Sequence, residues 1–356
     1  MFRAGLAEIA TPFALIDGRR LRQNIDAMQA AADSIGAALR PHFKTHRTIA
    51  IARLQRDAGA IGVTVATVPQ LVAASEVLGC PVLVSSILQG SGASSPELRR
   101  ACDAGEVAFA IESDRSIELL RTALGPDVGA DVVIELEAGC MRSGVPASDC
   151  GALAAAAARS GFQVTGIFTY PGHAYIPGRA EEASAEELAA LELGARTLRS
   201  AGFDPRVISA GSTPTMPFAS PGVATEYRPG TYVFGDRQQL TLGSVQRADL
   251  AVTVVATVVA IHGDRVVLDA GGKALGRDAP RWLDGYGELA DGPHTPIARM
   301  YDHHAVVDAY TGPRPSVGDR LAIVPNNVNS VLALTRSAWL TDDGVVAEEL
   351  VPIADR

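Results

Sequence analysis

The sequence predicts an α/β protein in which a closed (β/α)8 barrel of the TIM type is followed by a second, mostly antiparallel β domain. The first observation behind this prediction is a regular alternation of short apolar segments with Ala-, Leu- and Arg-rich segments from Phe13 onward. Strands that alternate with helices form a parallel sheet. Eight such units over about 225 residues fit a closed barrel better than an open sheet. The second observation is a change of composition after about residue 245, where runs of β-branched residues separated by turn signals replace the alternation.

The predicted barrel strands are short runs rich in apolar residues, and the segments between them show helical spacing. After the first run, Leu21, Ile25 and Met28 recur three or four residues apart, as they do on one face of a helix. The predicted strands lie at residues 13–16, 39–44, 61–66, 81–86, 106–112, 131–137, 164–169 and 206–210.

The C-terminal part of the chain is rich in β-branched residues. Residues 251–259 (AVTVVATVV) and 265–269 (RVVLD) favour strands, and Gly263-Asp264 and Gly271-Gly272 are turn signals near them. This texture predicts an antiparallel β domain, with which the first residues of the chain could also pair. We therefore expect a barrel over residues 13–244 and a β domain built from residues 1–12 and 245–356.

The composition limits the classes of partner. The 356 residues are 47% hydrophobic and 20% charged, as in an ordinary globular protein. A net charge of −9 and a pI near 5.3 argue against a nucleic-acid or anionic-membrane partner. No apolar run reaches the length of a membrane span, and the first residues lack the pattern of a signal peptide. The four cysteines show neither zinc spacing nor a disulfide framework, which predicts reduced thiols in a cytoplasmic protein.

Residues 39–47, with the sequence LRPHFKTHR, place a lysine at the end of a predicted strand. If residues 39–44 form the second strand, Lys44 lies at the C-terminal mouth of the barrel, where such folds carry out their chemistry. A lone lysine in a βα loop is more commonly a solvated surface residue. The sequence around Lys44 favours the first interpretation.

Residues 209–215, with the sequence SAGSTPT, follow the eighth predicted strand. Barrels commonly bind phosphate in the loops after strands seven and eight. Gly211 would let the backbone approach a phosphate, and the amides and hydroxyls of Ser212 and Thr213 could donate to its oxygens. A Gly-Ser-Thr loop taken alone is more commonly a helix cap. The position after the last predicted barrel strand favours a phosphate site.

Several words of the sequence resemble, in the same order, those of the D-threonine aldolase and D-serine dehydratase family. Its members are fold-type III pyridoxal 5'-phosphate (PLP) enzymes related to alanine racemase. The words include RPHFKTHR at residues 40–47, the GSTPT loop and EYRPGTY at residues 226–232, and they extend from Thr11-Pro12 to about residue 330. The resemblance implies a barrel that carries PLP, a C-terminal β domain, an amino-acid substrate and a homodimer with shared active sites.

The resemblance also implies roles for single residues around the cofactor. Lys44 would form the Schiff base with PLP, for which its amine needs a pKa lowered by desolvation and nearby positive charge. Arg142 matches the arginine of the family's D-x-G-x-x-R-x-G word, which approaches the phenolate oxygen of PLP. An exposed loop arginine is the alternative. Gly230, Thr231 and Tyr232 would lie near the cofactor.

Two further words imply candidate proton carriers. Tyr170 and His173 resemble the family's Y-x-G-H word and would stand at the barrel mouth beside the substrate. His173 could carry a proton because imidazole titrates near neutrality, although a structural histidine is an open alternative. His304 follows His303 where the family has an E-E-H-G word, and one of the two could face the cofactor opposite Lys44. Neighbouring residues on a strand point to opposite faces, so at most one would do so. A rim or fold-stabilising role is the alternative.

One word departs from the family pattern. Where the family has P-N-H-x-C or P-N-H-x-D, which supplies two metal ligands, this chain reads Pro325-Asn326-Asn327-Val328-Asn329. Asn327 and Asn329 are neutral amides, which are poor ligands for zinc or manganese compared with imidazole, thiolate or carboxylate. We therefore expect the chain to lack the family's tight divalent metal.

These observations leave three functions open. The first is a PLP-dependent lyase that cleaves or dehydrates a β-hydroxy D-amino acid, with His173 or Tyr170 handling the hydroxyl proton. The second is a metal-independent PLP racemase or epimerase, in which Lys44 and a base such as His304 serve opposite faces of the α-carbon. The third is a PLP carrier without catalytic activity, which the lysine, the GSTPT loop and the arginine together disfavour.

Overall fold

The computed structural model describes residues 6–86, 95–291, 294–342 and 344–354. The chain divides into two compact units. We call Ala27–Gly230 with Ile353–Arg356 the barrel unit, and Met1–Asp26 with Thr231–Pro352 the β unit. Residues 13–26 and 231–244, which the predicted boundaries give to the barrel, therefore belong to the β unit.

Eight parallel strands form the sheet of the barrel unit, in the order β2-β9-β8-β7-β6-β5-β4-β3. A parallel bridge between His42 and Thr64 joins the segment after β2 to β3, so the two ends of the sheet meet. The predicted TIM-type barrel is thereby confirmed. The strands are β2 (Ala38–Leu39), β3 (Val63–Val65), β4 (Val82–Val84), β5 (Val107–Ile111), β6 (Asp131–Leu136), β7 (Gln163–Thr169), β8 (Val207–Ala210) and β9 (Glu226–Tyr227).

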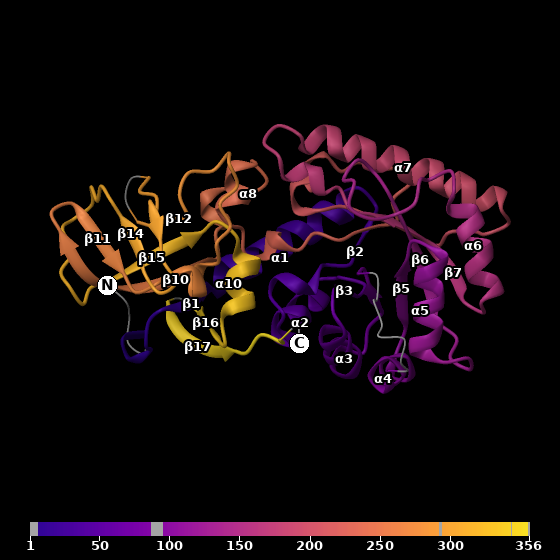
Figure 1. The fold of residues 1–356 in the computed structure, drawn as a ribbon, viewed down its shortest axis with the longest axis horizontal. Helices are drawn as coiled ribbons and strands as arrows, with labels where there is room; N and C mark the ends of the chain where they lie inside the picture. The colour runs from indigo at the N-terminus through magenta and orange to yellow at the C-terminus, as the bar shows by residue number, and fades with distance from the viewer. Residues whose placement is uncertain (1–5, 87–94, 292–293, 343, 355–356) are drawn as a thin grey trace. The chain divides into compact units, whose positions relative to one another are not determined.

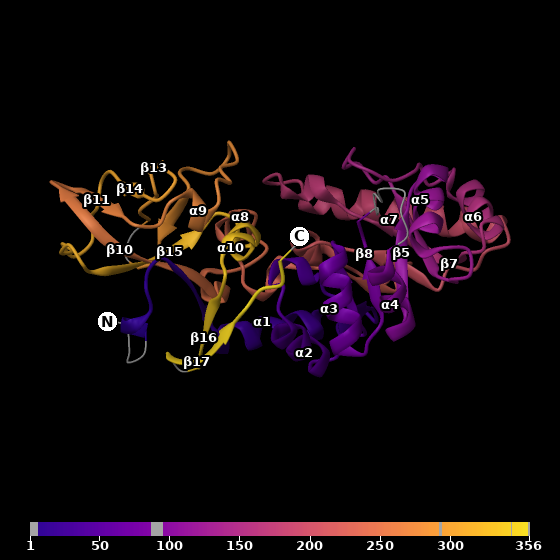
Figure 2. The ribbon, with the colours of Figure 1, turned by 60° about the horizontal axis from the view of Figure 1, so that its bottom comes forward.

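Helices lie on the outside of these strands, as Figures 1 and 2 show. Several begin at a side-chain cap: the hydroxyl of Thr67 accepts from the Gln70 amide, and Ser113 forms a reciprocal capping box with Ser116. The helices are α1 (Gly18–Ser34), α2 (Ile49–Asp57), α3 (Val68–Leu78), α4 (Pro96–Ala104), α5 (Asp114–Leu124), α6 (Cys150–Arg159) and α7 (Ala180–Ser200), with 3₁₀ turns η2 (Phe43–Thr45), η3 (Gly172–Tyr175) and η4 (Thr213–Phe218).

The prediction of the first barrel strand was wrong, and residues 206–210, predicted as the eighth strand, form the seventh barrel strand, β8. Residues 13–16 form β1 (Phe13–Asp17), which pairs with strands of the β unit rather than with the barrel. The eighth barrel strand is instead the short β9, which pairs with β2 and β8 and which periodicity did not reveal. Its Glu226 makes a buried ion pair with Arg40, whose Nη2 lies 2.8 Å from Oε2. In barrel order, the SAGSTPT loop therefore follows the seventh strand, still within the usual phosphate-binding region.

The β unit contains a nine-stranded sheet in the order β13-β14-β11-β10-β1-β16-β17, with β15 pairing both β10 and β12. Its pairs are antiparallel except for β1 with β16, which confirms the mostly antiparallel domain. The strands are β10 (Val252–His262), β11 (Arg265–Leu268), β12 (Gly287–Leu289), β13 (Arg299–Met300), β14 (Ala305–Val307), β15 (Arg320–Pro325), β16 (Ala338–Asp342) and β17 (Val345–Leu350).

Short helices complete the β unit. They are α8 (Arg237–Thr241), α9 (Gly272–Leu275) and α10 (Val328–Leu334), with 3₁₀ turns η1 (Leu6–Glu8), η5 (Thr231–Val233) and η6 (Arg247–Asp249). The predicted turn at Gly263-Asp264 is present, because these two residues connect β10 to β11.

Candidate active site

Lys44 lies in the turn η2, which follows the short strand β2, rather than at the end of a longer strand as predicted. Its pKa is lowered from 10.5 to about 8, first because burial disfavours the charged amine and then because Arg142 and Arg228 repel it. The neutral, nucleophilic fraction of the amine near neutral pH is therefore far larger than for a lysine with the ordinary pKa. The chain contains only one other lysine, Lys273, which is exposed in the β unit.

The residues around Lys44 fix the position of its backbone. His42 accepts a hydrogen bond from the Lys44 amide through Nδ1 at 3.4 Å, and its Nε2 lies 3.3 Å from Ser85 Oγ. Burial also lowers the pKa of His42 well below its ordinary value, so this imidazole is neutral. Arg47 has a positive φ of 56° and donates from Nε to the Lys44 carbonyl at 3.2 Å. The side chains of His42 and Arg47 thereby stabilise the backbone conformation of η2.

Three predicted site residues meet around one aromatic ring. Lys44 Nζ lies 5.6 Å from the centroid of the Tyr170 ring, and the Arg142 guanidinium carbon lies 4.5 Å from it. Arg142 also donates to Glu135 at 3.1 Å, a buried carboxylate at the end of β6. This pairing orients the guanidinium and partly neutralises it. The barrel mouth thus brings together an activated amine, a cation and a phenol.

His173 lies in η3, after β7, and its ring is held by a residue that the sequence did not indicate. Its Nε2 lies 2.7 Å from Oε2 of Glu186 on α7, whereas Nδ1 is buried and has no hydrogen-bond partner among the described residues. A carboxylate beside Nε2 favours the tautomer with the proton on that nitrogen, which leaves Nδ1 as the acceptor. At Gly139, with φ of 94°, a Cβ would come within 3.0 Å of the His173 ring.

The SAGSTPT loop is shaped from within the protein. The Gly211 amide donates to Glu187 Oε1 at 2.8 Å, and the Ser212 amide donates to Thr215 Oγ1 at 3.0 Å. These two amides therefore already have hydrogen-bond acceptors within the barrel unit, and the role of the loop in phosphate binding stays a prediction. The loop nevertheless carries three hydroxyl side chains, of Ser212, Thr213 and Thr215, at the start of η4.

Arg228 is a buried cation that the sequence analysis passed over, although it belongs to the EYRPGTY word. It donates to Ser209 Oγ at 2.5 Å and to the Thr169 carbonyl. Ser209 in turn donates to Glu226 at 2.6 Å. The positive charge of Arg228 lowers the pKa of both Lys44 and His42, so it contributes to the electrostatic potential around Lys44. Its signal in the sequence was the arginine beside Pro229-Gly230.

The other predicted site residues divide between the units. Gly230 ends the barrel unit, where a Cβ would lie 2.8 Å from Thr45 Oγ1. Thr231 and Tyr232 begin the β unit and are buried in η5. The predicted position of these three residues near the cofactor stays a prediction.

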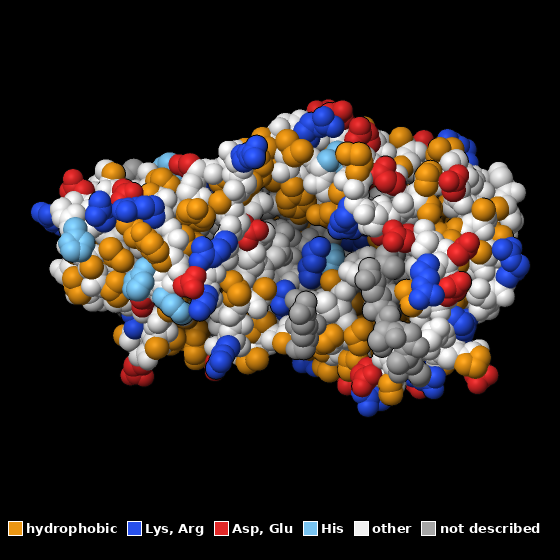
Figure 3. Space-filling model, in the orientation of Figure 1, with side chains coloured by type: hydrophobic (Ala, Val, Ile, Leu, Met, Phe, Trp, Pro, Cys, Tyr) orange, Lys and Arg blue, Asp and Glu red, His pale blue; other side chains and the backbone are white. Residues whose placement is uncertain are grey.

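His303 and His304 lie in an exposed turn that a Tyr301–His304 backbone hydrogen bond closes, not on a strand as assumed. The argument from alternating strand faces therefore does not apply to them. His303 Nε2 lies 3.5 Å from Lys273 Nζ, and Asp302 Oδ2 lies 3.9 Å from the same nitrogen. Histidines stand among basic and acidic side chains on the visible face of the β unit (Figure 3). A catalytic role for His304 stays a prediction.

Asn327 and Asn329 lie at the start of α10, in a hydrogen-bond network that includes Asp278. Asn327 Oδ1 accepts from the Asn329 amide at 2.9 Å, and its Nδ2 donates to Asp278 Oδ1 at 3.2 Å. Ser330 Oγ donates to the second oxygen of Asp278 at 2.5 Å. Asn327 thus acts as a helix cap. In the described part of the chain, no group of three His, Cys, Asp or Glu residues could hold a metal ion.

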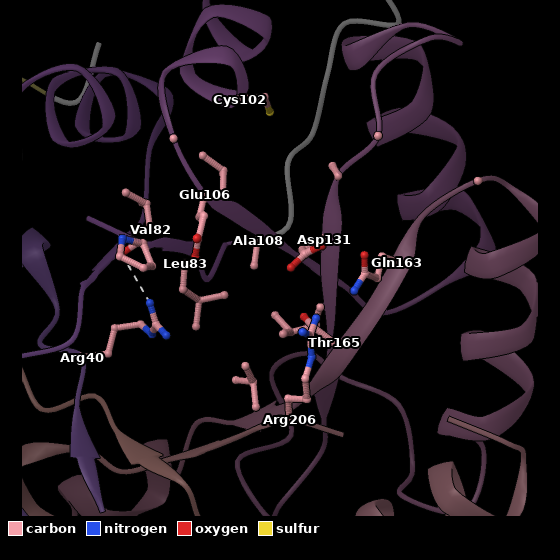
Figure 4. Close-up of a pocket in the computed structure, with 18 residues that line it drawn as sticks. Arg40, Val82, Leu83, Cys102, Glu106, Ala108, Asp131, Gln163, Thr165 and Arg206 are labelled. Atoms are coloured by element: carbon pink, nitrogen blue, oxygen red, sulfur yellow. Dashed lines mark hydrogen bonds between the residues drawn. The ribbon is translucent and has the colours of Figure 1, made fainter. Parts of the chain in front are cut away.

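A cavity of about 810 Å³ lies at the other end of the barrel from Lys44. Its polar lining stands where strands begin, as Figure 4 shows for Glu106, Asp131, Gln163 and Arg206. Chemistry in this fold is carried by the loops at the opposite, C-terminal ends of the strands. Lys44, Arg142 and Tyr170 do not line this cavity, so it is not the candidate active site.

Comparison with known proteins follows the division into two units. A family model described as "Alanine racemase, N-terminal domain" matches residues 16–238, and one described as "Putative serine dehydratase domain" matches residues 251–340. None of the helices in the described part of the chain combines the length and apolarity needed to span a membrane.

Relatives of the chain are similar over nearly its whole length. D-threo-3-hydroxyaspartate dehydratase of Delftia sp. (strain HT23) is 32% identical over 90% of this chain and 91% of its own. D-threonine aldolase of Arthrobacter sp. is 28% identical over 96% of this chain and 92% of its own. The structure of a mutant of D-threo-3-hydroxyaspartate dehydratase in the metal-free form superposes with a TM-score of 0.89 at 27% identity, covering 99% of this chain and 100% of that one.

Proposed function

Because the chain belongs to the family with an alanine racemase N-terminal domain and a serine dehydratase domain, we propose that it is a PLP-dependent lyase that acts on a β-hydroxy D-amino acid. The observation that carries the proposal is the setting of Lys44. One of only two lysines in the chain lies at the barrel mouth with a pKa of about 8, beside Arg142 and Tyr170. PLP, when bound, supplies an electron-accepting ring that favours bond breaking at the α-carbon of an amino acid.

The residues at the mouth fit this cofactor. Lys44 offers the amine, Arg142 offers a cation for the ring oxygen, and the loop at Ser212 and Thr213 offers hydroxyls for the phosphate. Thr45 Oγ1 is buried beside Lys44 and has no hydrogen-bond partner among the described residues, as expected of a hydroxyl that awaits a polar ligand. Unpaired buried polar groups are uncommon in folded proteins, and a bound ligand is one of the partners that satisfies them.

His173 lies in η3, which follows β7 and Tyr170, and it would move a proton. Glu186 holds Nε2, so Nδ1 would take the proton of the substrate β-hydroxyl in retro-aldol cleavage or return one to it in dehydration. The arrangement of a base oriented by a carboxylate is a recurring one in acid–base catalysis. Tyr170, whose pKa is raised by burial, stays protonated near neutral pH and would act as a donor.

Within the proposal, the lyase works without the tight divalent metal of its family. The support comes from Asn327 and Asn329, whose side-chain amides are poor ligands for zinc or manganese. Asn327 also caps α10 and donates a hydrogen bond to Asp278. Elemental analysis of protein purified without chelator tests this statement. One equivalent of zinc or manganese that is lost on replacement of both asparagines by alanine would contradict it.

A metal-independent racemase or epimerase is the second candidate, and the same two asparagines favour it, because exchange of an α-proton needs no metal. It lacks an identified second base, since His304 lies in an exposed turn of the β unit. The lyase is preferred because the relatives that cover nearly the whole chain are named as a dehydratase and an aldolase.

Proton NMR of one set of incubations distinguishes these activities. PLP-loaded protein is given D-threonine or D-threo-3-hydroxyaspartate in D2O, with a chelator in one tube and manganese in the other. Dehydration gives 2-oxobutyrate or oxaloacetate with ammonia, and retro-aldol cleavage gives glycine with the corresponding aldehyde. Deuterium at the α-carbon or the opposite α-epimer, without either product, would establish the racemase instead.

Two further parts of the proposal concern the state of the enzyme. We propose a homodimer in the cytoplasm, on the strength of the family resemblance and the cysteine pattern. Light scattering of the purified protein tests the first, and cell fractionation tests the second.

A further inference from the structure

Glu187 is a carboxylate buried inside the barrel unit, on the face of α7 that contacts the strands. Only 1% of its surface is exposed. Its Oε1 accepts two hydrogen bonds, from Thr169 Oγ1 at 2.7 Å and from the Gly211 amide at 2.8 Å. A glutamate is almost never fully buried unless its oxygens are paired. One oxygen of Glu187 therefore joins α7 to the end of β7 and to Gly211 of the SAGSTPT loop.

The segment Gly211–Thr213 depends on this contact for its shape. Gly211 has a φ of 93°, and a Cβ at this position would lie 2.7 Å from Cδ1 of Tyr227. The next residue is fixed from the other side, because Ser212 and Thr215 cap η4 reciprocally. Without an acceptor for its amide, Gly211 would carry a buried unsatisfied donor, which is costly enough to make the backbone rearrange.

The charges around Glu187 are arranged so that it does not repel an anion bound nearby. Burial raises the pKa of Glu187, whereas the Thr169 and Gly211 hydrogen bonds and the Arg228 charge oppose that rise. Arg228 also donates to the carbonyl of Thr169, the residue whose hydroxyl binds Glu187. The carboxyl group is therefore either neutral or compensated by the buried guanidinium.

We propose that Glu187 is a positioning residue that holds Gly211–Thr213 in the shape that receives the phosphate of PLP. The inference rests on the proposed function, because it takes PLP as the cofactor. It assigns the effect to the acceptor oxygen of Glu187 rather than to its charge. A glutamine at this position would keep an oxygen for both donors, whereas an alanine or a methionine would not.

The test compares the affinities of PLP and pyridoxal, which lacks the phosphate, for the full chain freed of cofactor. Absorbance titrations give both dissociation constants for the wild type, E187A, E187Q and E192A. The last variant changes an exposed glutamate of the same helix, which lies 3.9 Å from Arg196. We expect E187A to weaken PLP binding roughly tenfold or more and pyridoxal binding far less, since the Gly211 amide would lose its acceptor. E187Q and E192A should keep the wild-type ratio of the two affinities.

A role for Glu187 in general stability would give a different pattern, because PLP and pyridoxal would then weaken together. Equal losses for the two ligands, or a wild-type ratio in E187A, would overturn the inference. A ratio of PLP affinity to pyridoxal affinity in E187Q that differs from the wild-type ratio would overturn the assignment to the acceptor oxygen. If E187A does not fold, E187M, which refills the volume, gives the same comparison. A wild-type chain that binds no PLP would instead refute the proposed function itself.

Discussion

Replacing Arg142 by methionine should raise the pKa of Lys44. The two charged groups lie over one ring, 5.6 Å and 4.5 Å from its centroid, so they are at most about 10 Å apart. At an effective dielectric constant of about 20, their unscreened repulsion is at least about 1.7 kcal/mol, which corresponds to roughly one pKa unit. The Arg142 side chain is half exposed, and water and salt screen the interaction. We therefore expect a rise of about 0.5–1 unit above the wild-type value of about 8.

Competitive labelling with acetic anhydride measures this pKa directly, because the chain has only two lysines. Mass spectrometry of the peptides that contain Lys44 and Lys273 reports the reactivity of each amine as the pH is varied. Lys273 is an internal reference, since it lies exposed in the β unit. R142K, which keeps the charge, should leave the Lys44 value nearly unchanged.

An unchanged Lys44 pKa in R142M would refute the contribution of Arg142 and leave the lowered pKa to burial and Arg228. A fall would contradict it outright, because removing a cation can only favour the protonated amine. Glu135 would lose its salt bridge with Arg142 but keep the hydrogen bond from Ser143, and its charge would act in the expected direction. The double variant R142M/E135Q separates the two contributions.

Three further predictions follow from the same geometry. K44M should stabilise the cofactor-free protein near neutral pH by roughly 1–3 kcal/mol. The pKa of Lys44 in the folded protein, about 8, lies below its ordinary value of 10.5. The destabilisation caused by Lys44 therefore grows as the pH falls from 10.5 to about 8, and it reaches its full size below pH 8. Calorimetry should show the gain vanish above the ordinary value, and an equal gain at all pH values would contradict this cause. G211A should destabilise the protein by more than about 1 kcal/mol, because of the positive φ and the contact with Tyr227, and should weaken PLP binding; wild-type denaturant midpoints would refute it. N327A should lower stability by about 0.5–2 kcal/mol through loss of the α10 cap, and an unchanged melting temperature would show that the cap contributes nothing.

The fold could be predicted from the sequence where strands were long enough to show a period. The alternation of apolar runs and helices gave the central barrel strands, and the β-branched runs gave the second unit. Residues 13–16 were misassigned because four apolar residues do not indicate which sheet they join. β9 was missed because it has only two residues, one of them Glu226, whose burial depends on Arg40 far away in the chain.

The site was predictable where a residue belonged to a recognisable word. Lys44, Arg142 and Tyr170 meet as the resemblance implied. Glu186 and Glu187 were missed because α7 is an acidic helix, in which glutamates are usually solvated. Their partners, His173 and Gly211, come from two different loops and become visible only once the barrel brings those loops to the same helix.

The central claim is that Lys44 at the barrel mouth carries the cofactor. Borohydride reduction of the PLP-loaded protein, followed by peptide mass spectrometry, tests it most directly, because the only competing lysine is Lys273. The account predicts one pyridoxyl group on the peptide that contains Lys44 and none on the peptide that contains Lys273. A label on Lys273, or no label on either lysine at saturating PLP, would contradict it.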